Sequence, residues 1–179
     1  MTNFLLLITT LTCILLTGCR TESEVVQELT ESRINARASS VDIITRSVQN
    51  NGVTGEIVFT GNDILWFNET TKEIRFKDNS LYKSAAFSYP SIEFYIDDEY
   101  LFSSMTYVNS LSSQTFNRLV FYYDILGNKY YLADGYPEVS VLLDPQEAQV
   151  LRDENMQKIS SEWNKFIIQL KTEGRYKTN

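Results

Sequence analysis

The chain contains no histidine. A Ser-His-Asp triad, a Cys-His catalytic pair and a histidine-ligated zinc site are therefore excluded. Cysteine is nearly absent as well, since Cys13 and Cys19 are the two in the chain. Glycine and proline number 7 and 3, and the sequence has no glycine-rich phosphate-binding loop. These absences remove most hydrolase and metalloenzyme classes, so we expect no cofactor and no bound metal.

Positive charge is also scarce, with 16 Lys and Arg against 23 Asp and Glu and a net charge of -7. Residues 1–18 carry no charged side chain, so the acidic balance belongs to the rest of the chain. Binding to nucleic acid requires a basic surface, and this composition excludes it as a partner. Aromatic residues make up 13% of the chain, which is typical of a β-rich globular domain.

The long apolar run at the N-terminus, Phe4 to Leu16, is too short to span a bilayer, which takes about 20 residues. It reads as the apolar region of an export signal. The run leads into Leu16-Thr17-Gly18-Cys19, which resembles the lipobox of bacterial lipoproteins. That resemblance implies cleavage between Gly18 and Cys19 and attachment of lipid to Cys19. The alternative is a short buried helix with an unmodified core cysteine.

A lipidated Cys19 has consequences for the whole chain. Cleavage would remove Cys13, so the mature protein would have neither a free thiol nor a disulfide. Two or more acyl chains hold a protein firmly on a bilayer, and we expect the membrane to be a partner through this N-terminal anchor. The expected location is the bacterial cell envelope, at the outer membrane, with the periplasmic face and the cell surface both open.

The expected domain organisation has three parts. Residues 1–18 form the lipoprotein signal peptide. Residues 19–40 hold the lipidated cysteine and a polar, Glu-rich tether. Residues 41–179 form one folded domain, because their length suffices for a single core.

Alternation of apolar and polar residues predicts strands between turn signals within this domain. A strand is expected at residues 54–60 and a last one at 139–143. Hairpins are expected at residues 64–76, 92–105 and 118–133. Consecutive hairpins predict a mostly antiparallel meander.

The C-terminal part predicts a helix. Asp144 is suited to cap it, Pro145 to occupy its first turn, and Gly174 to end it. Apolar residues recur at helical spacing between these ends, at Leu151, Ile159, Trp163, Phe166, Ile167 and Leu170. We therefore predict an α+β fold in which one long amphipathic helix packs on one face of the sheet. Residues 152–158 are polar, which leaves open a kink or a protruding first half of this helix.

Three segments together resemble a set of small lipoproteins that occur in many paralogous copies in gut anaerobes and have no established activity. They are FTGNDILWFNETTKEIRFK, KYYLADGYP and EWNKFIIQLKTEGRY. The resemblance spans residues 55–176. It assigns no catalytic or ligand residue, and it implies that Cys19 is a lipidation site.

Asp97, Asp98 and Glu99 form the first candidate site, at a predicted hairpin tip. Adjacent carboxylates can bind Ca²⁺ or supply the acid pair of a glycoside hydrolase. Asp-Asp is also favourable turn chemistry. We favour the turn, because the segment lacks the alternating ligands of a calcium loop.

Four tyrosines form the second candidate site: Tyr122, Tyr123, Tyr130 and Tyr131. They lie on strands predicted to pair, so one of each couple should point to each face of the sheet. One face could be an aromatic platform for a glycan or a protein partner. Cross-strand packing explains the same residues without a ligand.

The functional expectation is a non-catalytic binding or interaction module. Two alternatives stay open, a carboxylate-dependent enzyme acting on glycans and an accessory or inhibitory subunit of an envelope complex.

Overall fold

The computed structural model describes residues 31–39, 55–83, 85–109 and 114–178. The expected signal peptide and the lipobox with Cys19 lie outside these ranges. No helix in the described part of the chain is long and apolar enough to span a membrane.

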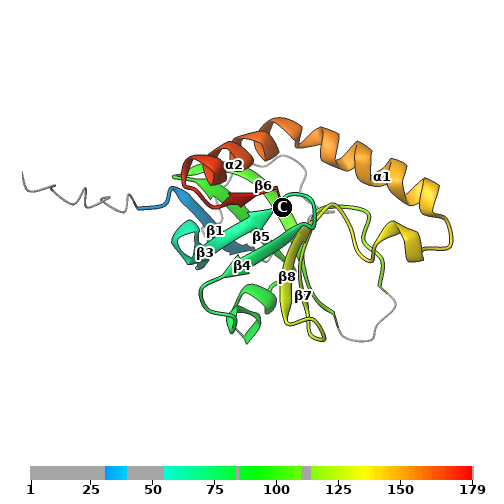
Figure 1. Ribbon diagram of the computed structural model, residues 1–179, viewed down its shortest axis with the longest axis horizontal. Helices are drawn as coiled ribbons and strands as arrows, with labels where there is room; N and C mark the ends of the chain where they lie inside the picture. Colours follow the sequence, from blue (N-terminus) through cyan, green and yellow to red (C-terminus); the bar gives the residue numbers. More distant parts are fainter. Residues whose placement is uncertain (1–30, 40–54, 84, 110–113, 179) are drawn as a thin grey trace, which may run out of the picture. The chain divides into compact units, whose positions relative to one another are not determined.

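The described residues form an α+β fold with one sheet and two helices (Figure 1). The strands are β1 (Ile34–Ser39), β2 (Ile57–Thr60), β3 (Ile64–Asn68), β4 (Glu73–Phe76), β5 (Ser91–Ile96), β6 (Glu99–Asn109), β7 (Val120–Asp124), β8 (Lys129–Ala133) and β9 (Tyr176–Lys177). The helices are α1 (Pro145–Lys158) and α2 (Ser160–Thr172). Short 3₁₀ turns are η1 (Gly61–Asp63), η2 (Leu81–Lys83), η3 (Ala85–Phe87) and η4 (Val139–Val141).

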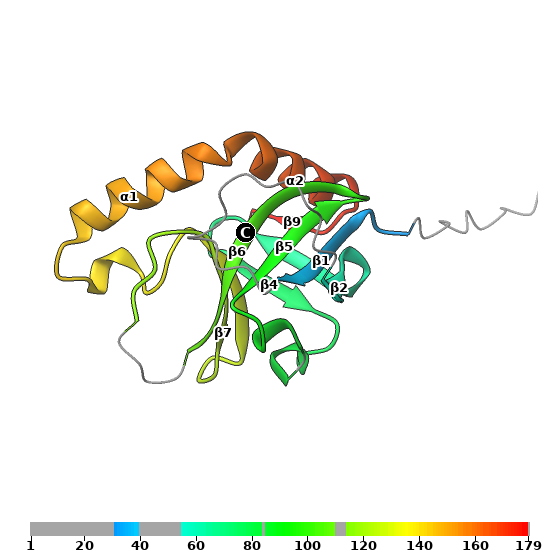
Figure 2. The ribbon, with the colours of Figure 1, turned by 180° about the vertical axis from the view of Figure 1, so that it is seen from behind.

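The sheet curls on itself. Its strand order is β2-β1-β5-β6-β7-β8-β4-β3-β9, so β2 and β4 are far apart along the ladder of hydrogen bonds. Even so, the ring of Phe59 on β2 lies 4.9 Å from that of Phe76 on β4 and 5.7 Å from that of Phe121 on β7. The strands therefore wrap around a shared aromatic core, and the ribbon seen from behind shows the curl of the sheet (Figure 2).

Helix α2 covers one opening of this curled sheet. Its buried residues are Trp163, Phe166, Ile167 and Leu170. The fully buried ring of Phe166 lies 5.6 Å from Phe94 and 5.5 Å from Phe102. This apolar face is the one that the helical spacing predicts.

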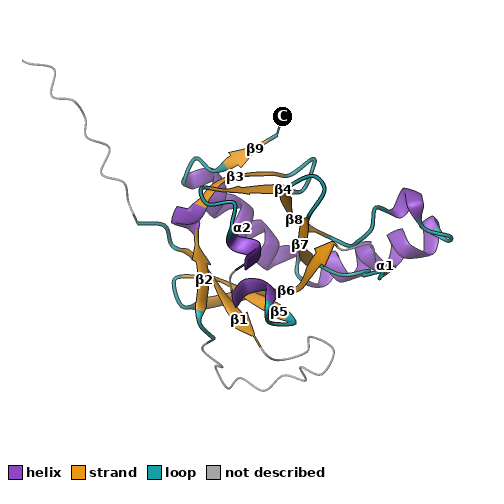
Figure 3. Ribbon diagram, turned by 90° about the horizontal axis from the view of Figure 1, so that it is seen from below, coloured by secondary structure: helices purple, strands orange, loops and turns teal. Residues whose placement is uncertain are grey.

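The single long helix expected from residue 145 is in fact two helices. The backbone of Ile159 (φ -113, ψ 14) separates them. Helix α1 packs mainly against η4, and it extends past the strands in the view from below (Figure 3). Leu151, expected in the core, is exposed, whereas Ala148 and Arg152 are the buried residues of α1. The physical reason is that polar residues 152–158 offer no apolar stripe to hold α1 on the sheet.

The predicted ends of the helical region are confirmed. The Asp144 carboxylate accepts a hydrogen bond from the Glu147 N–H at 3.0 Å, and Pro145 occupies the first turn. Gly174 ends the region with φ of 68, a conformation that glycine adopts without a Cβ clash.

All three predicted hairpins form, as β3–β4, β5–β6 and β7–β8. Most strand pairings are antiparallel, as predicted, but the sheet is mixed and its strand order is not that of a simple meander. β6 and β7 run parallel, as do β3 and β9. The strand expected at residues 139–143 is also wrong, since this segment forms η4 and leaves Val141 and Leu143 exposed.

The folded part begins earlier than the boundary expected at residue 41. Strand β1 lies within residues 19–40, which we expected to be a tether, and it pairs with both β2 and β5. Ile34, Ala36 and Ala38 are buried on it. Small alanines pack in the core without adding a strong apolar signal, which explains why the strand is inconspicuous in the sequence.

A carboxylate holds the chain where it enters this strand. Glu173, just after α2, accepts hydrogen bonds from the Ser32 hydroxyl at 2.6 Å and the Arg33 N–H at 3.3 Å. The Arg175 guanidinium lies 3.1 Å from the same carboxylate. We call this group the Glu173 clamp, and it ties the start of β1 to the end of α2.

Candidate functional site

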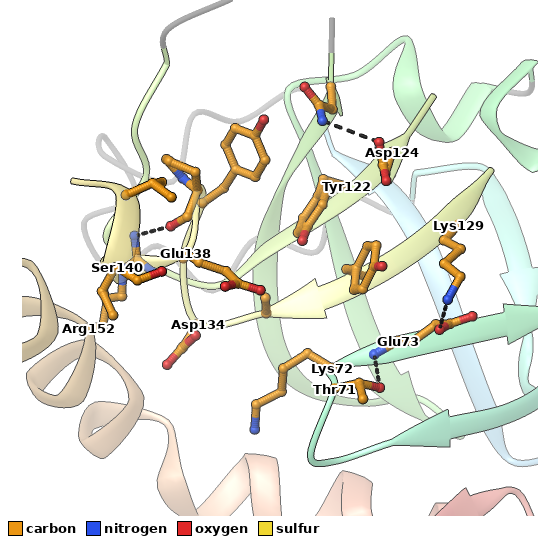
Figure 4. A pocket seen from close by; sticks show the side chains of 18 of the residues that line it. Thr71, Lys72, Glu73, Tyr122, Asp124, Lys129, Asp134, Glu138, Ser140 and Arg152 are labelled. Atoms are coloured by element: carbon orange, nitrogen blue, oxygen red, sulfur yellow. Dashed lines mark hydrogen bonds and ion pairs between the residues drawn. The ribbon is translucent and has the colours of Figure 1, made fainter. Parts of the chain in front are cut away.

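A cleft of about 970 Å³ opens beside strands β7 and β8. Residues 70–73, in the β3–β4 turn and the start of β4, form one wall (Figure 4). Residues 133–141, between β8 and α1, form the opposite wall, and Gln149 and Arg152 of α1 close one end. This volume is at the upper end of the roughly 300–1,000 Å³ typical of small-molecule sites.

The floor of the cleft belongs to a row of side chains across neighbouring strands, of which Tyr122, Tyr131 and Glu73 line the cleft. The strand registers place Tyr107 beside Tyr122, Tyr122 beside Tyr131, and Tyr131 beside Glu73. The rings of Tyr122 and Tyr131 stack with centroids 4.8 Å apart and planes 15° apart. Such pairing is the usual way in which cross-strand aromatics stabilise a sheet.

Tyr136 joins this row from the loop after β8. Its ring meets Tyr122 edge-on at 5.0 Å and Tyr107 at 4.9 Å. Two backbone hydrogen bonds fix its position, because Phe116 and Tyr136 each donate an N–H to the other's carbonyl, at 2.7 and 2.9 Å. Tyr122, Tyr131 and Tyr136, which we call the tyrosine trio, therefore converge on the cleft.

The hydroxyls of the tyrosine trio have no hydrogen-bond partner within the described residues, although other tyrosines do. Tyr123, for example, donates to Asn128 at 2.8 Å. Burial raises the pKa of each trio phenol above its usual range. The Asp124 carboxylate raises the pKa of all three further. The phenols therefore stay protonated at neutral pH, so that each can both donate and accept a hydrogen bond.

In the structure, the four tyrosines of the predicted site point to two opposite faces of the sheet, as the alternation of side chains along a strand requires. Tyr122 and Tyr131 face the cleft, whereas Tyr123 and Tyr130 are buried on the other face. Tyr130 donates to the Asn79 carbonyl and accepts from the Tyr82 N–H, and burial raises its pKa to about 12. Tyr123 and Tyr130 therefore pack in the core, which corrects their assignment to a binding surface.

Two of the four carboxylates that line the cleft have structural partners. Glu73 forms an ion pair with Lys129 at 2.9 Å, and this contact raises the pKa of Lys129. Asp124 accepts hydrogen bonds from the backbone N–H groups of Leu126 and Gly127 and so holds the β7–β8 turn.

Asp134 and Glu138 are the other two carboxylates. Neither side-chain carboxylate has a hydrogen bond or ion pair with another described residue, and both residues line the cleft. Tyr122 lies between Asp124 on one side and Glu138 on the other (Figure 4). Asp134 and Glu138 are therefore the acceptors that a ligand could use.

Arg152 organises the closed end of the cleft. This side chain is 3% exposed, and it donates to the Pro137 carbonyl at 2.8 Å and the Asn117 side chain at 3.3 Å. Burial lowers the pKa of its guanidinium. A Cβ at Gly135 would lie 2.2 Å from the Arg152 Nε, so glycine is what lets the loop approach. Arg152 thereby ties α1 to the loop that carries Tyr136.

The acidic hairpin tip has a different character. Asp97, Asp98 and Glu99 each form an ion pair, with Arg33 at 2.5 Å, Arg37 at 3.1 Å and Lys165 at 2.6 Å. The Arg33 guanidinium lowers the pKa of Asp97. Within the described residues, no group of three acidic, His or Cys side chains could hold a metal ion. Each of the three carboxylates is thus paired with an Arg or Lys side chain, which favours the interpretation of this segment as a turn.

Sequence reasoning missed Tyr136, Asp134, Glu138 and Arg152. The first three follow β8 in a segment that reads locally as a turn, and Arg152 lies in a polar stretch of helix. Tyr136 alone carried a signal, as an aromatic residue next to an Asp-Gly turn.

No family model, no curated protein and no solved structure matches this chain.

Proposed function

We propose that this protein is a lipid-anchored, non-catalytic binding module of the bacterial cell envelope, and that its ligand occupies the cleft of the tyrosine trio. The observation that carries the binding role is the convergence of three phenol hydroxyls that have no hydrogen-bond partner in the described chain. The three tyrosines are half-buried, and none of their hydroxyls is among the fully buried side-chain atoms of the described chain that have no partner, so these hydroxyls can bond water or a ligand in the cleft. A cleft that keeps several of them available is suited to a ligand that supplies the missing bonds.

The anchor rests on the sequence around Cys19. Cys19→Ala should abolish labelling of the protein by an alkyne fatty acid fed to cells, because the thiol that accepts lipid is lost. Cys13→Ala is the matched control and should be labelled like the wild type, since Cys13 would leave with the signal peptide. Labelling that persists in Cys19→Ala would refute the lipoprotein assignment.

The binding role can be tested without knowing the ligand. The full chain, purified in detergent, is applied to an oligosaccharide array and a peptide array. Tyr131→Ala should abolish binding to the class of ligand, oligosaccharide or peptide, that the wild type binds, because the substitution removes a ring from the floor of the cleft. Tyr89→Ala is the control, since Tyr89 is exposed outside the cleft. The proposal would be overturned if the folded wild type bound neither array, or if the Tyr131→Ala variant bound as well as the wild type.

Asp134 and Glu138 keep the carboxylate-dependent enzyme as a second candidate. Glycoside hydrolysis requires two carboxylates flanking the scissile bond. Release of reducing ends from a bound oligosaccharide, lost in both Asp134→Asn and Glu138→Gln, would establish that candidate in place of a non-catalytic module. Binding to peptides alone, through the same cleft, would favour an accessory or inhibitory subunit.

A further inference from the structure

We infer that the ligand of the tyrosine trio cleft is an oligosaccharide of neutral sugars. This inference rests on the proposed binding function and names its ligand class. Three properties of the cleft carry it: the kind of hydrogen-bonding groups available, the balance of charge and the size.

The hydrogen-bonding groups match those of a sugar. Each phenol of the trio can donate one hydrogen bond and accept others, as each sugar hydroxyl can. Asp134 and Glu138 add acceptors, and Lys72 adds a donor from the facing wall. A ligand with many hydroxyls can satisfy phenols, carboxylates and an ammonium group together, which a purely donating or purely accepting ligand cannot.

The charges of the cleft nearly cancel. Its lining holds the carboxylates of Glu73, Asp124, Asp134 and Glu138 and the cations of Lys72, Lys129 and Arg152. Glu73 and Lys129 neutralise each other at 2.9 Å. A ligand that carries charge of one sign would meet side chains of its own sign among the lining residues as well as of the opposite sign, at a cost in binding free energy. A neutral ligand meets no such cost.

Aromatic surface and size complete the match. The rings of Tyr122 and Tyr131 line the floor, and the apolar ring surface that their mutual stacking leaves uncovered can contact the C–H groups of a sugar ring while the hydroxyls form hydrogen bonds. The volume of about 970 Å³ lies near the top of the range for small-molecule sites. We therefore assign the cleft to several linked sugars.

Calorimetric titration of the full chain in detergent tests the ligand class. The probes are neutral hexasaccharides of glucose, mannose and N-acetylglucosamine, an acidic hexasaccharide of galacturonic acid, and spermine as a polycation. At least one neutral hexasaccharide should bind, and more tightly than the acidic sugar or spermine.

The hydroxyls are tested by conservative variants. Tyr122→Phe and Tyr131→Phe keep the rings and should each weaken neutral-sugar binding by about 2- to 12-fold, the value of one hydrogen bond. Both should unfold at the wild-type temperature, because the lost hydroxyl bonds no described residue. Tyr89→Phe, outside the cleft, should bind like the wild type.

The outcomes separate the two proposals. Tighter binding of galacturonic acid or spermine, or selection of peptides alone, would refute the neutral glycan, and the binding function would stand if Tyr131→Ala abolished that binding. If both Phe variants and Tyr131→Ala bound the neutral sugar as tightly as the wild type does, the assignment to this cleft would be refuted. A folded protein that binds no probe and neither array would refute both proposals.

Discussion

Trp163→Ala is expected to lower the free energy of unfolding by about 3–5 kcal/mol, the usual cost of truncating a buried Trp. The indole is 9% exposed and lies within ring-contact distance of Phe67, Phe102 and Phe166, at 5.9, 5.6 and 5.7 Å. Its removal would leave a cavity where α2 closes the curled sheet. Urea denaturation followed by circular dichroism measures the change.

The control for this prediction lies on the same helix. Ile168 is 62% exposed, and Ile168→Ala removes apolar surface that is largely in water in the folded state. It should change the free energy of unfolding by no more than about 0.5 kcal/mol, as is usual for surface substitutions. Equal effects of the two substitutions would mean that α2 does not bury the face that carries Trp163.

Arg152→Met is expected to destabilise the protein by about 2–3 kcal/mol. The substitution removes two hydrogen bonds from a charged donor, worth roughly 1.5–3 kcal/mol each, and relief from burying the cation offsets part of that loss. The Pro137 carbonyl and the Asn117 side chain would lose their donor, and α1 would lose its tie to the wall of the cleft.

Two measurements check this second prediction. Urea denaturation gives the stability. Near-ultraviolet circular dichroism reports the surroundings of the aromatic side chains, the tyrosine trio among them, and the spectrum should change because Tyr136 shares a loop with Pro137. Glu154→Met is the control, since Glu154 is exposed on the same helix. An Arg152→Met protein as stable as Glu154→Met, with an unchanged spectrum, would show that Arg152 does not hold the loop.

Local signals in the sequence predict local structure well. Each of the three hairpins alternates around a polar turn, and such a pattern specifies its own partner strand. The helix cap at Asp144 and the stop at Gly174 are local in the same sense. Strand alternation also predicts that the two tyrosines of each couple point to opposite faces of the sheet, and the fold decides that Tyr122 and Tyr131 are the ones that face the cleft.

Pairing between distant segments is where the prediction fails. The parallel pairing of β6 with β7 depends on where the intervening chain returns, which no short pattern encodes. β1 pairs on both edges, yet its buried alanines carry little apolar signal. The cleft depends on such distant pairing too, because its floor comes from β7 and β8, its first wall from the β3–β4 turn and its end from α1.

The Glu173 clamp has a mechanical consequence. A pull on the chain ahead of Glu31 would first meet the hydrogen bonds that Ser32 and Arg33 make to Glu173. Beyond the clamp it would act along β1, whose hydrogen bonds to β2 and β5 flank it on both sides. The chain therefore enters the domain through a segment that must break the clamp and its hydrogen bonds to two neighbouring strands before it can leave the sheet.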